Sequence, residues 1–365
     1  MAHSDSELAS ALSTLRDPHL GRGLQELGMV GEVRERRRRL ELSLLVPVAG
    51  WPGTDELARQ VRRALSPLAG GEESVSVDVS VMDDSQRASL RAALGHEEGG
   101  PKFMAPGSRT RVVGISSGKG GVGKSSVTVN LAVALAAKGH EVGLLDADVY
   151  GFSVPAMLGV DTQPTAVDDL LVPPMVHGVR CLSMGYFVPD DQPVIWRGPM
   201  LHKALEQFLV DAYWGEPDFL LVDMPPGTGD VALSLGQYLP RTEVVVVTTP
   251  QPAAQRVAQR SAFAAKRLKM AVRGVVENMS WFTGDDGTRY ELFGAGGGQV
   301  LADRLEVPLL GCIPLVPEIR LGADAGVPVR VSDPGGEAAL AFDALADAVV
   351  GMGPARVYRR ELTVR

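Results

Sequence analysis

A glycine-rich segment with two lysines is the part of this chain best suited to chemistry. It reads Gly118-Lys119-Gly120-Gly121-Val122-Gly123-Lys124-Ser125, which matches the pattern G-x-x-x-x-G-K-[ST]. The glycines of such a loop let backbone N–H groups surround an anion, and the next helix adds the partial positive charge of its N-terminus. Lys124 then reaches the β- and γ-phosphates, and Ser125 can ligate Mg²⁺. The segment, extended to Ser126, therefore predicts a nucleoside triphosphate site.

Polar residues at the ends of apolar segments form a second candidate group. Asp146 and Asp148 follow one apolar run, and Asp223 ends another. Ligands of open α/β sheets bind at the carboxyl ends of strands, so these carboxylates are expected beside the loop. Asp223 is the candidate Mg²⁺ ligand, through water, and Gly227 could offer its N–H to the γ-phosphate. Asn278 has an amide that can pair with an adenine edge, although a turn-forming role is the alternative.

Short apolar strands separated by helical segments predict the scaffold that positions these residues. Strands are expected at Arg111–Ser116, Glu141–Asp146, Val179–Met184, Phe219–Asp223, Glu243–Thr248, Ala271–Asn278 and Pro308–Ile313. The run Val244–Val247 does not alternate, as expected when helices cover both faces of a parallel sheet. The predicted fold is therefore α/β, with a doubly wound, mostly parallel sheet.

The first hundred residues follow a different pattern. Leu40–Val46 and Val75–Val81 alternate with period two, and Glu56–Leu65 has helical spacing. A stretch rich in glycine, proline and charge follows, without apolar periodicity. We predict a small α+β domain at residues 1–95, a linker at 96–108, a phosphate-loop domain at 109–352 and a tail at 353–365.

Composition and charge exclude several classes of protein. The 365 residues are 45% hydrophobic and 22% charged, with a net charge of −8 and two cysteines. These values argue against a disordered or disulfide-stapled chain and against a broad nucleic-acid surface. The basic run Arg34–Arg39 is expected to be a solvated hairpin tip. No signal sequence or long apolar run is visible, so we expect a cytoplasmic protein without a membrane partner.

The second lysine of the loop, Lys119, is typical of a variant of this motif. It resembles the class that contains MinD, ParA and the nitrogenase iron protein. In that class the matching lysine reaches the nucleotide of the partner subunit, which implies a homodimer with two ATP molecules. The class also implies that Asp146 or Asp148 orients the attacking water, and the sequence does not separate the two. Lys119, Lys124 and these two aspartates are the catalytic candidates.

Further motifs resemble those of the Mrp/ApbC family of iron-sulfur cluster carrier ATPases. The match covers about residues 109–350 and includes Asp146–Ser153, Val194–Met200, Asp223–Asp230, Glu277–Phe282 and Phe293–Gly298. Leu15–Pro18 and Glu26–Val30 resemble the small iron-sulfur assembly domain that often precedes such ATPases. The resemblance implies ATP hydrolysis with Mg²⁺, a [4Fe–4S] cluster, and iron-sulfur assembly proteins or apoproteins as partners.

The cysteines that usually hold such a cluster are absent. The family's C-x-x-C positions fall on Gly284 and Gly287, and a cysteine expected in the N-terminal domain is replaced by Trp51. Cluster iron is usually held by thiolates, and the two cysteines present, Cys181 and Cys312, lie on predicted strands, where cysteine is usually a core residue.

Three functions therefore remain open. The first is a cluster carrier, the second a nucleotide switch like MinD or ParA, and the third a degenerate regulatory ATPase that binds no cluster. Asp285 and Asp286 could in principle bind a hard metal, but a polar turn is the favoured interpretation. The basic tail Arg356–Leu362 has no clear helical stripe and is expected to be a frayed end.

Overall fold

The chain forms two compact units. The computed structural model describes residues 5–36, 39–95, 107–149, 151–187, 198–225 and 230–353. One unit comprises Met1–Gly100, Pro164–Pro174 and Val210–Gly215, and the other comprises the rest. The first unit thus includes two short segments from the part of the sequence assigned to the ATPase. The domain limits at residues 95, 108 and 352 remain a prediction. Most of the predicted linker and most of the predicted tail lie outside the described residues.

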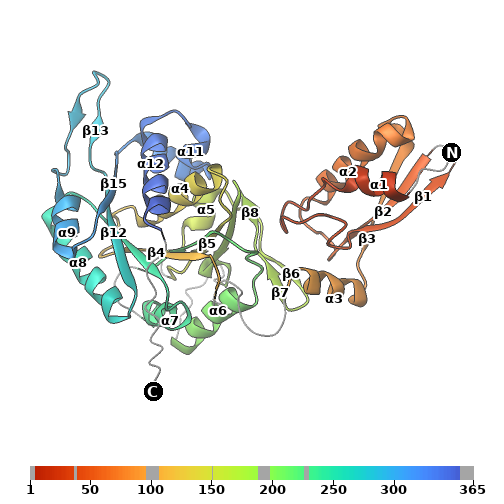
Figure 1. The fold of residues 1–365 in the computed structure, drawn as a ribbon. Helices are drawn as coiled ribbons and strands as arrows, with labels where there is room; N and C mark the ends of the chain where they lie inside the picture. Colours follow the sequence, from red (N-terminus) through yellow and green to blue (C-terminus); the bar gives the residue numbers. More distant parts are fainter. Residues whose placement is uncertain are drawn as a thin grey trace, which may run out of the picture. The chain divides into compact units, whose positions relative to one another are not determined.

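The first unit is a three-stranded sheet covered by helices (Figure 1). Its elements are α1 (Asp5–Leu12), β1 (Val30–Arg36), β2 (Arg39–Val46), α2 (Thr54–Ala69), η1 (Glu72–Ser74), β3 (Val75–Val81) and α3 (Asp84–Ala93). Strand β2 pairs antiparallel with β1 and parallel with β3. Leu42 and Leu44 alternate toward a core that also holds Leu57 and Val61 of α2. This arrangement has the elements that the period-two runs predict.

A hairpin from later in the chain completes this core. Strands β6 (Thr165–Val167) and β7 (Leu170–Val172) pair antiparallel. Val167 and Leu170 are buried in the same cluster as the residues of α2 and β2. Arg87 donates to Asp168 at 3.0 Å, and Arg91 pairs with Asp169. The sequence did not predict this hairpin because its strands are only three residues long.

Trp51 has a structural role in the first unit. Its indole N–H donates to Asp17 Oδ2 at 2.8 Å, and both side chains are buried. Asp17 Oδ1 accepts backbone N–H bonds from His19 and Leu20. The position at which the family often has a cysteine is therefore occupied here by part of a buried hydrogen-bond network.

The second unit is built on an eight-stranded sheet with the order β15-β12-β11-β4-β10-β5-β9-β8. The strands are β4 (Arg111–Ser117), β5 (Val142–Asp146), β8 (Met175–Val176), β9 (Val179–Ser183), β10 (Phe219–Asp223), β11 (Glu243–Thr248), β12 (Ala271–Asn278) and β15 (Leu309–Ile313). All neighbours are parallel except β8 and β9. The predicted strands agree with these to within one residue at each end.

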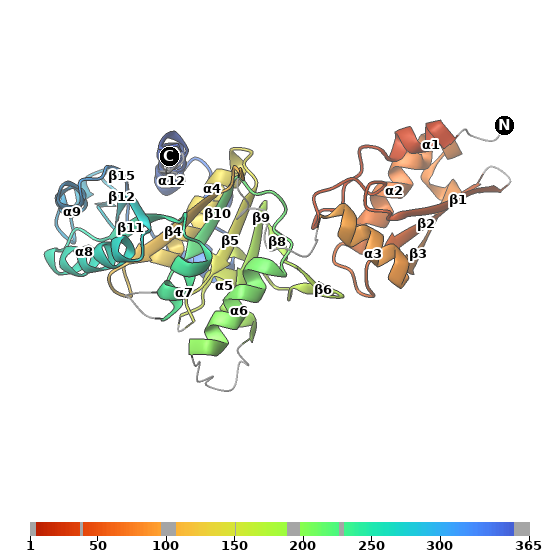
Figure 2. The same cartoon turned by 60° about the horizontal axis from the view of Figure 1, so that its bottom comes forward.

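Helices cover both faces of the sheet, as Figures 1 and 2 show for α4 and α12 on one side and α8 on the other. The helices are α4 (Lys124–Ala137), α5 (Val154–Leu158), η3 (Met184–Phe187), α6 (Gly198–Val210), α7 (Asp230–Tyr238), α8 (Pro252–Arg267), α9 (Gly297–Leu305), α10 (Pro317–Ala325), α11 (Val329–Ser332) and α12 (Glu337–Gly351). Every residue of β4, β10 and β11 is buried. The structure thus confirms the predicted doubly wound α/β fold and explains the unalternating valines. In the described ranges, none of the helices has the length and hydropathy needed to cross a bilayer.

Candidate nucleotide site

The glycine-rich loop connects β4 to α4 and has the shape of an anion cradle. Gly123 is the N-cap of α4 with φ of 79°, and Gly121 has φ of 80°. A Cβ at Gly118 would lie 2.2 Å from the backbone of α8, so no side chain fits there. A Cβ at Gly120 or Gly121 would meet no atom within 4 Å, which leaves that side of the loop open. The loop therefore offers backbone N–H groups and a helix N-terminus to an anion.

Asp223 is the centre of the polar network beneath the loop. Its Oδ2 accepts hydrogen bonds from Lys124 Nζ at 2.6 Å and from Ser125 Oγ at 2.7 Å. The hydroxyl of Thr128 lies 2.7 Å from Asp223 Oδ1 and 2.9 Å from the Lys124 carbonyl oxygen. Asp223 is buried at the end of β10, next to β4 and β5 in the sheet. The structure thus brings together the predicted lysine, serine and aspartate.

Thr128 was missed by the sequence analysis. It lies one turn of α4 after Lys124, and residues four apart share a helix face. This spacing is the only signal that could have identified it.

The donor set fits Mg²⁺ and a polyphosphate. Ser125 and Asp223 supply oxygen ligands of the kind that Mg²⁺ prefers, held 2.7 Å apart. Lys124 Nζ also lies 3.5 Å from Asp148 Oδ2, so the lysine ammonium is close to the carboxylates of both Asp223 and Asp148. Asp148 Oδ1 is buried and finds no hydrogen-bond partner among the described residues. An orphaned buried oxygen requires an explanation, and a bound cation or water would supply one.

The two aspartates after β5 have different surroundings. Asp146 accepts hydrogen bonds from the backbone N–H groups of Asp148 at 3.1 Å and Val154 at 3.3 Å, and from Ser183 Oγ at 3.0 Å. Burial, followed by the nearby charge of Asp223, raises the pKa of Asp146 to about 7. The carboxylate of Asp146 is therefore occupied by backbone N–H groups and Ser183, whereas the carboxylate of Asp148 lies close to Lys124 of the glycine loop.

The remaining predicted site residues differ in exposure and in hydrogen bonding. Lys119 is exposed, and its ammonium group forms no ion pair with any residue in the described ranges. Asn278 is buried, and its Nδ2 donates to the Val122 carbonyl oxygen at 2.9 Å. The carbonyl of Ser126 accepts a hydrogen bond from Asn130 at 2.9 Å. Gly227 lies outside the described residues.

Among the residues that the structure describes, neither cysteine lies in a group that could hold a metal. Cys181 is fully buried on β9, where burial and then the charge of Asp146 raise the pKa of its thiol well above the ordinary value. Cys312 is half-buried on β15, and burial followed by Glu277 raises its pKa. In the described parts of the chain, no group of three or more histidine, cysteine or acidic side chains is placed to hold a metal.

The segment aligned with C-x-x-C forms the polar turn that the sequence favours. Strands β13 (Phe282–Thr283) and β14 (Arg289–Tyr290) pair antiparallel. Asp286 accepts from the Thr288 backbone at 2.9 Å and from the Thr288 hydroxyl at 2.8 Å, and these bonds lower the pKa of the Asp286 carboxyl. Gly287 has φ of 78°, a conformation that glycine adopts without strain.

Comparisons with known families match nearly the whole chain. The family described as ParA, NUBPL iron-transfer P-loop NTPase, matches residues 108–350. The family of iron-sulfur cluster assembly proteins matches residues 5–79. Relatives named iron-sulfur cluster carrier protein include one from Mycobacterium tuberculosis, 45% identical over 90% of this chain and 89% of the relative. The one from Escherichia coli is 38% identical over 94% of this chain and 90% of its own.

Solved structures are similar to about two thirds of this chain. A nucleotide-binding protein from Archaeoglobus fulgidus, solved in complex with ADP, has 33% identity and a TM-score of 0.54 over 63% of this chain and 90% of that protein. The cell division ATPase MinD from Pyrococcus furiosus has 25% identity and a TM-score of 0.51 over 66% of this chain and 99% of its own. These matches agree with the geometry of the glycine loop. This chain belongs to the Mrp/NUBPL family of iron-sulfur cluster carrier P-loop NTPases and carries an N-terminal iron-sulfur assembly domain.

Proposed function

We propose that this chain binds and hydrolyses ATP with Mg²⁺ and acts as a homodimer in iron-sulfur cluster carriage or assembly. The observation that carries the proposal is the convergence of Lys124 and Ser125 on Asp223 beneath an open glycine loop. Ser125 would ligate Mg²⁺ directly, and Asp223 would hold it through water. The bound ion would neutralise charge on the phosphates. The similar nucleotide-binding protein from Archaeoglobus fulgidus was solved in complex with ADP, which supports nucleotide binding by this chain.

Binding of the triphosphate would require a rearrangement of Lys124. Its ammonium now pairs with Asp223 and lies close to Asp148. The β- and γ-phosphates would draw Nζ toward the loop, while backbone N–H groups at the start of α4 hold the same oxygens. Both carboxylates would then be available to the metal and to the attacking water.

Asp148 and Asp146 would have separate tasks. Asp148 has an unsatisfied buried oxygen and contacts Lys124, so we assign it to orienting water at the γ-phosphate. Asp146 binds the backbone at Asp148 and Val154, so we assign it to positioning this segment. A carboxylate that already accepts three hydrogen bonds has little capacity left for substrate.

Lys119 would act across a dimer interface. Its side chain is exposed at the mouth of the loop, where it can reach a facing subunit.

Asn278 and Gly227 would also contact the nucleotide. The Nδ2 of Asn278 donates to the Val122 carbonyl, and its amide oxygen and second N–H would be used for an adenine contact. Gly227 is the proposed N–H donor to the γ-phosphate. We place the reaction in the cytoplasm, with no nucleic acid or membrane as partner.

The iron-sulfur cargo is the part of the proposed function that depends on cysteine ligands. The curated relatives are named carriers, yet here Gly284 and Gly287 form a turn and Cys181 is buried. This observation favours a second candidate function, that of an ATPase that regulates assembly without holding a cluster. In either case the partners would be iron-sulfur assembly proteins or apoproteins.

Nucleotide titration of the full chain tests the ATPase proposal. Lys124→Ala should weaken MgATP binding by about 100-fold or more, since it removes the lysine that would hold the phosphates of the subunit's own nucleotide. Lys119→Ala should retain binding but lower kcat by about 1,000-fold, as expected of a cation supplied in trans. Arg304→Glu, an exposed change on α9, is the control. Full turnover in Lys119→Ala would contradict the contact between subunits.

Anaerobic reconstitution separates the two candidate functions. After incubation with iron and sulfide and removal of excess reagent, a carrier should retain stoichiometric iron and acid-labile sulfide. A Cys312→Ser variant should lose that cluster if the half-buried thiols of two subunits hold it. Retention of no iron by a wild-type protein that still binds ATP would support the regulatory function instead.

A further inference from the structure

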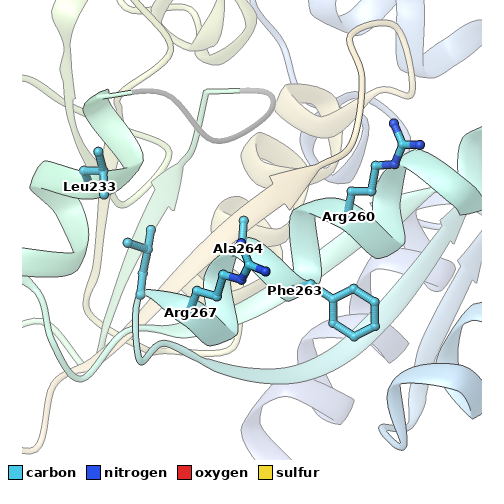
Figure 3. A pocket seen from close by; sticks show the side chains of 6 residues that line it. Leu233, Arg260, Phe263, Ala264 and Arg267 are labelled. Carbon is cyan, nitrogen blue, oxygen red and sulfur yellow. The ribbon is translucent and has the colours of Figure 1, made fainter.

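Helices α7 and α8 border a groove on the second unit that the nucleotide site does not use. Its volume is about 500 Å³. Figure 3 shows the side chains that line it, which are Leu233, Arg260, Phe263, Ala264, Arg267 and Leu268. All of them belong to α7, α8 or the residue directly after α8. The groove is therefore a feature of two neighbouring helices.

Two large apolar side chains that line the groove, Leu233 and Phe263, are exposed, and we call them its floor. Leu233 is 47% and Phe263 46% exposed, from different helices. A partner that covers these side chains removes their apolar surface from water, which stabilises a complex. Single exposed apolar residues are ordinary, but two large ones that line the same concave site are typical of a binding surface.

The two arginines that line the groove, Arg260 and Arg267, are called its rim here, and they are basic although the chain as a whole has a net negative charge. The sequence has 44 acidic and 36 basic residues, yet α8 contains four basic residues and no acidic one. Arg256, Arg260, Phe263 and Arg267 are spaced by four, three and four residues, so they share one face of the helix. Neither Arg260 nor Arg267 forms an ion pair with a residue in the described ranges. The guanidinium groups are thus available for carboxylates of a partner.

We propose that this groove binds an acidic amphipathic segment of a partner protein. Leucine- or phenylalanine-type side chains spaced by three or four residues would fill the floor, and flanking aspartates or glutamates would pair with Arg260 and Arg267. A nucleic acid fits less well, because its phosphates would leave the apolar floor uncovered. A second copy of this chain fits less well, because a twofold contact would bring two cationic α8 helices together.

Site-specific photocrosslinking in the full-length protein identifies the occupant. The probe p-benzoylphenylalanine replaces Leu233 in the groove, or Leu340 on the exposed face of α12 as a matched control. In cells that make the protein, the Leu233 probe should capture a segment of another protein with net negative charge and apolar residues at helical spacing. Capture of this chain itself, of nucleic acid or lipid, or of nothing beyond the control, would overturn the proposal.

A synthetic copy of the captured segment then measures the contribution of each groove residue. By fluorescence anisotropy, Phe263→Ser and Arg260→Glu should each weaken binding about 10-fold or more. Exchange of the peptide's acidic residues for lysine should restore affinity to Arg260→Glu and abolish it for the wild type. The controls Leu340→Ser and Arg304→Glu should bind like the wild type. Unchanged affinity in Phe263→Ser or Arg260→Glu would contradict the proposal, and MgATP titration of every variant verifies its fold independently.

Discussion

Asp146 makes the stability of the second unit depend on pH. Burial, followed by the charge of Asp223, raises its pKa from 3.8 to about 7. The unfolded chain releases this proton near the ordinary pKa, whereas the folded protein keeps it until the raised one. The stabilising contribution of Asp146 to the free energy of unfolding is therefore fully present below about pH 4, and it is lost as the pH rises through about 7.

Asp146→Asn should flatten that dependence. The amide does not titrate, so between about pH 4 and pH 7 the free energy of unfolding of the variant should fall less steeply than that of the wild type. Urea denaturation of the nucleotide-free protein, in the absence of Mg²⁺, measures both slopes. Two parallel pH profiles would show that Asp146 titrates alike in the folded and unfolded states.

At the scale of elements, the loop between β4 and α4 depends on Gly123 for two reasons. Its φ of 79° disfavours any L side chain, and a Cβ there would lie 2.2 Å from Asn278 Nδ2. That nitrogen holds the Val122 carbonyl, so a methyl group would also break the bond between β12 and the loop. The sequence predicted the glycines from the motif, but only the fold brings Asn278 against them.

Gly123→Ala should destabilise the protein by about 2–4 kcal/mol, from left-handed strain and the lost hydrogen bond. Gly120→Ala is the matched control, because no atom lies within 4 Å of the added methyl and φ there is not positive. It should change stability by less than about 0.5 kcal/mol. Urea unfolding midpoints compare the two. Equal midpoints for both variants would refute the steric argument.

At the scale of the whole molecule, the first unit is not continuous in sequence. The β6–β7 hairpin contributes Val167 and Leu170 to its core, and the Tyr213 hydroxyl donates to the Leu20 carbonyl at 3.0 Å. These residues come from the part of the chain assigned to the ATPase by its sequence. The first unit therefore needs residues more than seventy positions beyond its own last helix, α3.

Leu170→Ala should destabilise the first unit by about 2–4 kcal/mol, because Leu170 is 1% exposed and its loss leaves a cavity. Hydrogen exchange at the amides of β2 reports this change, and MgATP affinity should stay at the wild-type value. Asp169→Ala, an exposed residue of the same hairpin, should cost less than about 1 kcal/mol. Unchanged exchange in β2 of Leu170→Ala would mean that the hairpin does not support this core.

The sequence by itself determined the sheet, the loop and the family, because each depends on local patterns. Unalternating apolar runs specify buried parallel strands, and the glycine-lysine motif specifies a phosphate loop. Only the tertiary structure distinguished Asp146 from Asp148, added Thr128 and placed the β6–β7 hairpin in the first unit. These features depend on contacts between residues distant in sequence, which no local periodicity encodes. The α7–α8 groove also required the fold, since two helices form it together.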